Sequence, residues 1–179
     1  MKKLAIILIL LVVAFESFSQ VQYVESSKLD SLVWHRINSY LVSLGKTPIK
    51  HFEDSLSREY SYEVTRVNAD AEMIAHSKNV GLVTTAECIY QETHRGMNSE
   101  LQVMIDKKEY DKIAKLIVDS WIASETHRNL ISINNYAATT VTTVLKYDKT
   151  GKIASVTASW HAIDDPKIWT TRSGYVFRP

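Results

Sequence analysis

The chain has 179 residues, a length that suggests one domain. Without residues 1–19 it carries 19 basic and 19 acidic side chains, and this balance favours neither nucleic acid nor an anionic membrane surface as a partner. Five glycines and three prolines leave little material for a long linker, so a second domain is not indicated.

The N-terminus predicts a cleavable secretory signal over residues 1–19. Lys2 and Lys3 precede an apolar run of twelve residues, Leu4 to Phe15, and Ser17 and Ser19 supply the small side chains expected before a cleavage site. A bilayer span needs about twenty apolar residues. We therefore expect an exported protein, periplasmic or extracellular, with one domain over residues 20–179 and no stable membrane anchor after cleavage. An uncleaved anchor is the alternative.

Helices are predicted for much of the first half. Apolar residues recur at helical spacing over 27–44, where Ser27 and Asp30 resemble a capping pair and Gly45 is a natural stop. A second helix is predicted over 54–67. The next stretch predicts either a short strand or irregular structure up to residue 85, followed by a short strand over 87–91.

The second half predicts a broken helix and then a hairpin. Residues 99–123 have helical periodicity, with a break expected at 106–109. Two Thr- and Val-rich stretches, 136–147 and 152–163, flank a turn and predict antiparallel strands. The tail from Asp164 adds an edge strand or wraps the core. These elements predict an α+β fold, a three-layer α-β-α sandwich with a small central antiparallel sheet.

Cys88 is the only cysteine of the chain, so an intramolecular disulfide is excluded. The thiol is either buried and inert or part of an intermolecular cross-link. Burial is favoured because free cysteine is among the most buried residue types.

Reactive side chains are densest just after Trp121, where Ser124, Glu125, His127 and Arg128 follow within seven residues. One interpretation is structural. The Ser124 hydroxyl would cap a short helix by accepting from a backbone N–H of residue 126 or 127, and Glu125 and Arg128 would form a surface ion pair. The other interpretation gives His127 a place in a functional site.

His76 and Glu87 are the second candidate pair. Glu87 lies in an apolar stretch, where a carboxylate is costly to bury unless a cation or hydrogen-bond donors meet it. Arg128, a protonated histidine or a metal ion would each meet that need. The structural alternative leaves Glu87 exposed on an edge strand.

The pattern Trp121-x-x-Ser124-x-x-His127-Arg128-x-x-Ile131 resembles a motif of the CAP superfamily in its bacterial form. This superfamily, also called the SCP domain, includes cysteine-rich secretory proteins, antigen 5 and pathogenesis-related 1. His76 falls in the position of the family's first cavity histidine, and the segment around Glu87 falls in the position of its Gly-Glu-Asn segment. Ala86 and Cys88 replace that glycine and asparagine, and the family's second cavity glutamate has no clear match. The resemblance covers most of residues 27–163.

The resemblance implies a cleft in which two histidines and a glutamate hold a divalent cation, often zinc. Carried over residue by residue, the metal ligands would be His76, Glu87 and His127, with Ser124, Glu125 and Arg128 as further cleft residues. Two imidazoles and a carboxylate suit Zn²⁺. This interpretation requires the His76 and His127 rings to lie within about 8 Å of each other.

A non-enzymatic exported binding module is the leading hypothesis, and no catalytic residue is assigned. One alternative is a metal-dependent hydrolase of envelope or host material, with Glu125 as base or Ser124 and His127 as a nucleophile pair. The other is a lipid- or sterol-binding carrier, a role of some eukaryotic family members. The sequence leaves open whether the partner is a small ligand or a protein.

Overall fold

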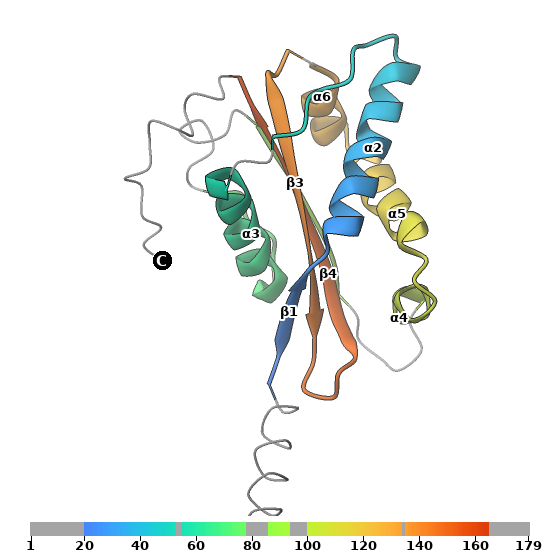
Figure 1. Ribbon diagram of the computed structural model, residues 1–179, viewed down its shortest axis with the longest axis vertical. Coiled ribbons are helices and arrows are strands. Elements are labelled where there is room, and N and C mark those ends of the chain that lie inside the picture. The colour runs from blue at the N-terminus through green and yellow to red at the C-terminus, as the bar shows by residue number, and fades with distance from the viewer. Residues whose placement is uncertain (1–19, 53–54, 78–85, 94–99, 134, 165–179) are drawn as a thin grey trace, which may run out of the picture.

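A four-stranded antiparallel sheet forms the middle of the molecule (Figure 1). The computed structural model describes residues 20–52, 55–77, 86–93, 100–133 and 135–164, so the expected signal, the tail and residues 78–85 lie outside the described part. The strands are β1 (Gln22–Glu25), β2 (Ala86–Thr93), β3 (Ala138–Tyr147) and β4 (Ile153–Ile163), in the spatial order β1-β3-β4-β2.

Helices cover both faces of this sheet (Figure 1). Helix α3 (Ser55–Asp70) packs against β3 and β4 on one side. On the other side α2 (Ser27–Ser43) packs against β3 and against α5 (Tyr110–Ala123), with α4 (Glu100–Asp106) before α5 and α6 (Glu125–Ile133) after it. The predicted α+β sandwich with its central antiparallel sheet is confirmed. None of the described helices has the length and apolar character needed to cross a bilayer.

Helix α2 buries one stripe because Leu29, Val33, Ile37 and Leu41 recur every four residues. Burying each such side chain contributes about 1.5–3 kcal/mol. The stripe belongs to the main core, between the sheet and the α2–α5 layer, which also contains Cys88, Ile113, Ile117, Trp121, Trp160 and Ala162. A smaller core under α3 contains Tyr60, Val64, Ile89, Ala138 and Ile163. Cys88 is fully buried, as expected, and burial raises the pKa of its thiol.

The capping of α2 differs from the prediction by one residue. Ser26, not Ser27, is the N-cap, and its hydroxyl accepts from the Leu29 N–H at 3.4 Å. Asp30 instead accepts from the backbone N–H and the hydroxyl of Thr143, both at 2.6 Å, and so links the helix to β3. Gly45 follows the helix with a φ of 72°, which confirms its role as a stop residue.

The expected break in the 99–123 helix is present between α4 and α5. Lys108 adopts a φ of 56°, and the Glu109 N–H donates to the Met104 carbonyl at 2.8 Å, so the first helix ends in a left-handed turn.

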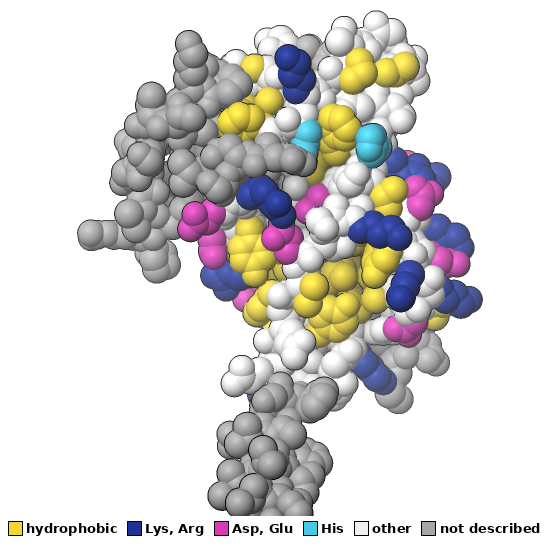
Figure 2. Space-filling model, in the orientation of Figure 1, with side chains coloured by type: hydrophobic (Ala, Val, Ile, Leu, Met, Phe, Trp, Pro, Cys, Tyr) yellow, Lys and Arg dark blue, Asp and Glu magenta, His cyan; other side chains and the backbone are white. Residues whose placement is uncertain are grey.

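Basic and acidic side chains are interspersed on the face that Figure 2 displays, as the balanced composition leads one to expect.

Strand pairing brings Glu87 of β2 opposite His161 of β4. Their neighbours Cys88 and Trp160, which are also paired, point to the opposite side and enter the main core. Glu87 and His161 therefore face α3. This register is what positions the candidate site.

Candidate functional site

A buried carboxylate, Glu87, lies at the centre of the candidate site. Its side chain is fully buried, and its Oε2 accepts a hydrogen bond from His161 Nε2 at 2.9 Å. Oε1 accepts from His76 Nδ1 at 3.0 Å and from the Ser77 backbone N–H at 2.9 Å. Because an ionised carboxylate only accepts, the facing nitrogens of both histidines carry the proton in these contacts. Glu87 thus joins a buried imidazole to one at the surface.

Hydroxyl groups on the α3 side of the sheet hold the His161 ring in place. Its side chain is 1% exposed, and its Nδ1 lies 3.0 Å from Ser61 Oγ. Ser61 Oγ lies 3.2 Å from Ser159 Oγ, which is 2.6 Å from Thr65 Oγ1. With the Nε2 proton directed at Glu87, the Nδ1 side of the His161 ring faces the Ser61 hydroxyl. This network fixes the ring and therefore the position of the carboxylate.

The pKa of Glu87 is the result of opposing effects. Burial raises the pKa, but the hydrogen bond and the charge of His161 lower it, and the Ser77 N–H and His76 lower it further. The net pKa lies below the ordinary value of 4.5. Glu87 is therefore ionised at neutral pH despite its burial.

His76 and His127 lie next to each other, although 51 positions separate them in the sequence. Their ring centroids are 6.4 Å apart, and the planes meet at 67°. The His76 side chain is 60% exposed, and its Nε2 makes no hydrogen bond within the described part of the chain. His127 is half-buried; burial first, and then the charge of His76, lower its pKa. The lowered pKa favours the neutral form of His127 at pH 7.

The two imidazoles meet the proximity condition set by the sequence, but Glu87 does not lie beside them as an open ligand. Both of its oxygens are directed at protein donors, and in the described part of the chain no three His, Cys, Asp or Glu side chains are arranged to hold a metal ion. A cation at this place would take one nitrogen from each of His76 and His127. Glu87 would then be the carboxylate behind a ligating histidine, which fixes the tautomer and orientation of that ring.

Arg128 is not the charge partner of Glu87, as the sequence had suggested. Its Nη1 donates to the Ile122 carbonyl at 2.8 Å and so satisfies an acceptor near the end of α5. Helix geometry explains the difference, because the turn between α5 and α6 directs the guanidinium back along α5. The hydrogen-bond donors to Glu87 are the two histidines and the Ser77 backbone N–H instead.

Ser124 occupies the junction of α5 and α6 in an extended conformation, and its carbonyl accepts from the Arg128 N–H at 2.8 Å. The predicted cap from its hydroxyl to the first turn of α6 is not formed within the described residues. Its hydroxyl also makes no hydrogen bond to His127 there, so a nucleophile pair has no support. Glu125 is exposed in the first turn of α6.

Sequence reasoning missed His161 and Ser61. A histidine between Trp160 and Ala162 in an alternating strand was the available signal, since a polar ring there must find buried partners. Its relation to Glu87 depends on the β2–β4 register, which no local pattern specifies.

Comparison with known proteins gives a distant structural similarity. No protein-family model matches the chain, and no curated protein matches it. Among solved structures the chain is similar to an outer surface protein from Borrelia burgdorferi, with a TM-score of 0.46 and 7% sequence identity over 82% of this chain and 100% of that one.

Proposed function

We propose that this chain is an exported, non-enzymatic binding module in which His76 and His127 contact the ligand. One observation carries the proposal: the buried Glu87 carboxylate accepts from His76 Nδ1, and Nε2 of that exposed ring has no hydrogen-bond partner in the described part of the chain. An ionised group with no exposed surface costs free energy to bury. The burial of Glu87 is explained if its function is to orient His76 beside His127.

A divalent cation such as zinc is the ligand class that this donor set suits best. Two neutral imidazole nitrogens are good ligands for zinc, copper and nickel, and a bound cation would supply positive charge to which an anionic partner group can bind. His76 is kept in one tautomer by Glu87, and His127 stays neutral because its pKa is lowered. Affinity should fall as the pH drops through the histidine range, about 6.5 and below.

The test is a calorimetric titration of zinc into the purified protein and two variants. His127→Ala should lower zinc affinity by more than about tenfold, because one of two protein ligands is lost. His35→Ala is the matched control, because His35 is exposed on α2 and lies outside the cluster. Equal zinc affinity in the wild type and His127→Ala would contradict the proposal for the cation. A loss in both variants would indicate unspecific binding to surface histidines.

A further inference from the structure

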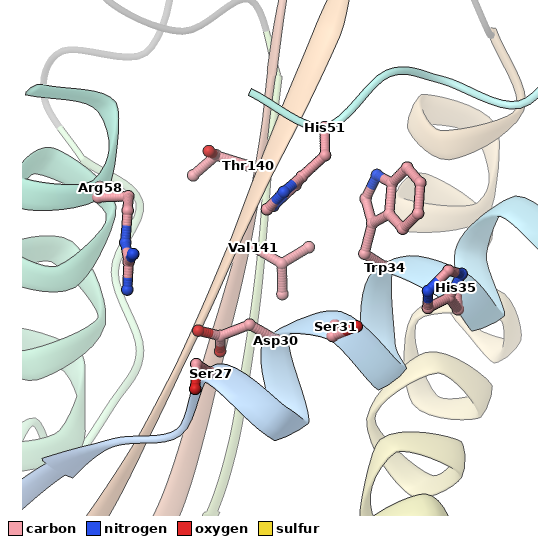
Figure 3. A pocket seen from close by; sticks show the side chains of 9 residues that line it. All are labelled: Ser27, Asp30, Ser31, Trp34, His35, His51, Arg58, Thr140 and Val141. Atoms are coloured by element: carbon pink, nitrogen blue, oxygen red, sulfur yellow. The ribbon is translucent and has the colours of Figure 1, made fainter. Parts of the chain in front are cut away.

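Along the edge of β3 that lies between α2 and α3, the row of backbone hydrogen bonds is interrupted by a gap. Beside this gap lies a cavity of about 300 Å³, which is separate from the His76–Glu87–His161 cluster. It is lined by side chains of α2, α3, β3 and the segment before α3, among them Asp30, Trp34, His51, Arg58, Thr140 and Val141. Figure 3 shows these side chains arranged around one space, with α2 below, α3 on one side and the segment that carries His51 above.

One end of the gap is closed by the segment before α3. The Thr139 N–H donates to the Lys50 carbonyl at 2.8 Å, and the Thr139 carbonyl accepts from the Phe52 N–H at 2.8 Å. If this segment continued along β3, the Phe52 carbonyl would accept from the Val141 N–H. It accepts instead from the Thr140 hydroxyl, at 2.5 Å, so this pairing stops after Thr139.

The other end of the gap is closed by the start of α2. The Thr143 N–H donates to Asp30 Oδ1 at 2.6 Å, and the Thr143 carbonyl accepts from the Ser26 N–H at 3.0 Å. Beyond this point β1 pairs with β3 from Val144 onward. The backbone edge is therefore satisfied at residue 139 and again at residue 143.

Val141 lies midway between these two residues in a stretch of β3 with continuous register. Backbone groups of every second residue in a strand point to the same side, so the Val141 N–H and C=O point to the same edge as those of Thr139 and Thr143. Within the described residues neither group has a hydrogen-bond partner. The cavity therefore presents one backbone donor and one backbone acceptor from a strand edge.

Polar groups around the cavity add to this pair. Asp30 is 7% exposed, and its Oδ2 has no hydrogen-bond partner in the described part of the chain. The Trp34 Nε1 is buried and also lacks a partner there, and its ring lies 5.5 Å from that of His51. A buried polar atom without a partner, such as Trp34 Nε1, is rare and requires an explanation. Arg58, paired with Glu25 at 2.8 Å, borders the cavity from α3.

We propose that this cavity binds a short extended peptide, one residue of which pairs through its own N–H and C=O with the C=O and N–H of Val141. A residue of an extended peptide presents its own N–H and C=O on one side, as one donor and one acceptor at strand spacing, and addition of a strand to a sheet edge is a common mode of peptide recognition. The volume is at the low end of ligand pockets, so it has room for a short segment.

The experiment uses the full mature chain labelled with ¹⁵N and two amide measurements. In the free protein, the Val141 amide should exchange with solvent faster than the amides of Thr139 and Thr143, which are hydrogen-bonded. Addition of N-acetyl-dialanine amide should then shift the Val141 resonance in a saturable way and slow its exchange. Equal protection of the three amides in the free protein, or no shift at saturating peptide, would overturn the proposal.

Two controls test the position and the chemistry of binding. Ser31→Phe places a ring at the cavity from an exposed position of α2, and it should lower peptide affinity by about tenfold or more, whereas Ser39→Phe on the same helix should not. A fully N-methylated peptide, which cannot donate to the Val141 carbonyl, should bind about tenfold more weakly or worse. Undiminished binding in Ser31→Phe, or equal binding of the two peptides, would overturn the proposal.

Discussion

At the scale of single residues, the most informative group is the Glu87 carboxylate. From the sequence we expected that a carboxylate in an apolar strand needs a cation or hydrogen-bond donors. Arg128, a protonated histidine and a metal ion were the candidates. The structure confirms the need and supplies two histidines and a backbone N–H. His161 was not predicted as a partner because the contact arises from strand register and not from any spacing along the chain.

Glu87→Gln should destabilise the protein by about 1–3 kcal/mol at pH 7, because His161 and His76 lose their charged acceptor. The folded-state pKa of Glu87 is below its ordinary value of 4.5. Its stabilising contribution is therefore complete above pH 4.5 and is lost as the pH falls through the lowered pKa. Urea unfolding at several pH values should show the difference between variant and wild type shrinking in acid.

Glu109→Gln provides the comparison for that measurement, since Glu109 pairs with Lys112 at the surface and contributes little. If the stability difference caused by Glu87→Gln were the same at every pH, the ionised form of Glu87 would not be the stabilising one.

At the scale of helices and strands, the elements whose signal lies within one short stretch of sequence were predicted well. The boundaries of α2, the break between α4 and α5, and the β3–β4 hairpin all follow from local residue patterns. Strand β1 was missed, because its four residues, Gln22–Glu25, have no alternation and form a strand only by pairing with β3. The cavity beside Val141 was also beyond prediction, because it is formed by three separate segments that meet at one sheet edge.

Two neighbouring residues of helix α5 test which face of the helix stabilises the folded protein. Ile117 is fully buried in the main core, and Ile117→Ala should cost about 2–5 kcal/mol through lost burial and a residual cavity. Its neighbour Leu116 is 44% exposed, so Leu116→Ala should change stability by about 0.5 kcal/mol or less. Similar losses in the two variants, measured by urea unfolding, would show that the assigned buried face is wrong.

At the scale of the whole molecule, two buried carboxyl groups give stability opposite dependences on pH. Burial raises the pKa of Asp30 to about 7, and hydrogen bonds from Thr143 only partly oppose it. The folded protein therefore retains a proton on Asp30 between pH 3.8 and about 7 that the unfolded chain has lost. Because the folded state binds more protons in that range, Asp30 makes stability decrease as the pH rises. Glu87 acts in the opposite direction at lower pH.

Asp30→Asn should remove this decrease, since an amide oxygen can still accept from Thr143 and does not ionise. We expect the variant to be at least as stable as the wild type at pH 8 and to gain no further advantage at pH 4. Thermal unfolding followed at both pH values checks this. A wild-type protein whose stability is flat from pH 4 to pH 7, and unchanged in Asp30→Asn, would contradict the buried and protonated Asp30.

The pairing of β1 with β3 also constrains when the molecule can fold. Gln22 pairs with Tyr147, and residues from the start of α2 close the edge of β3. The first strand of the described chain can therefore pair only after one of the last strands has been made. Contacts between residues so distant in sequence form late and slowly. A chain emerging from the ribosome cannot complete this sheet until its C-terminal hairpin is made.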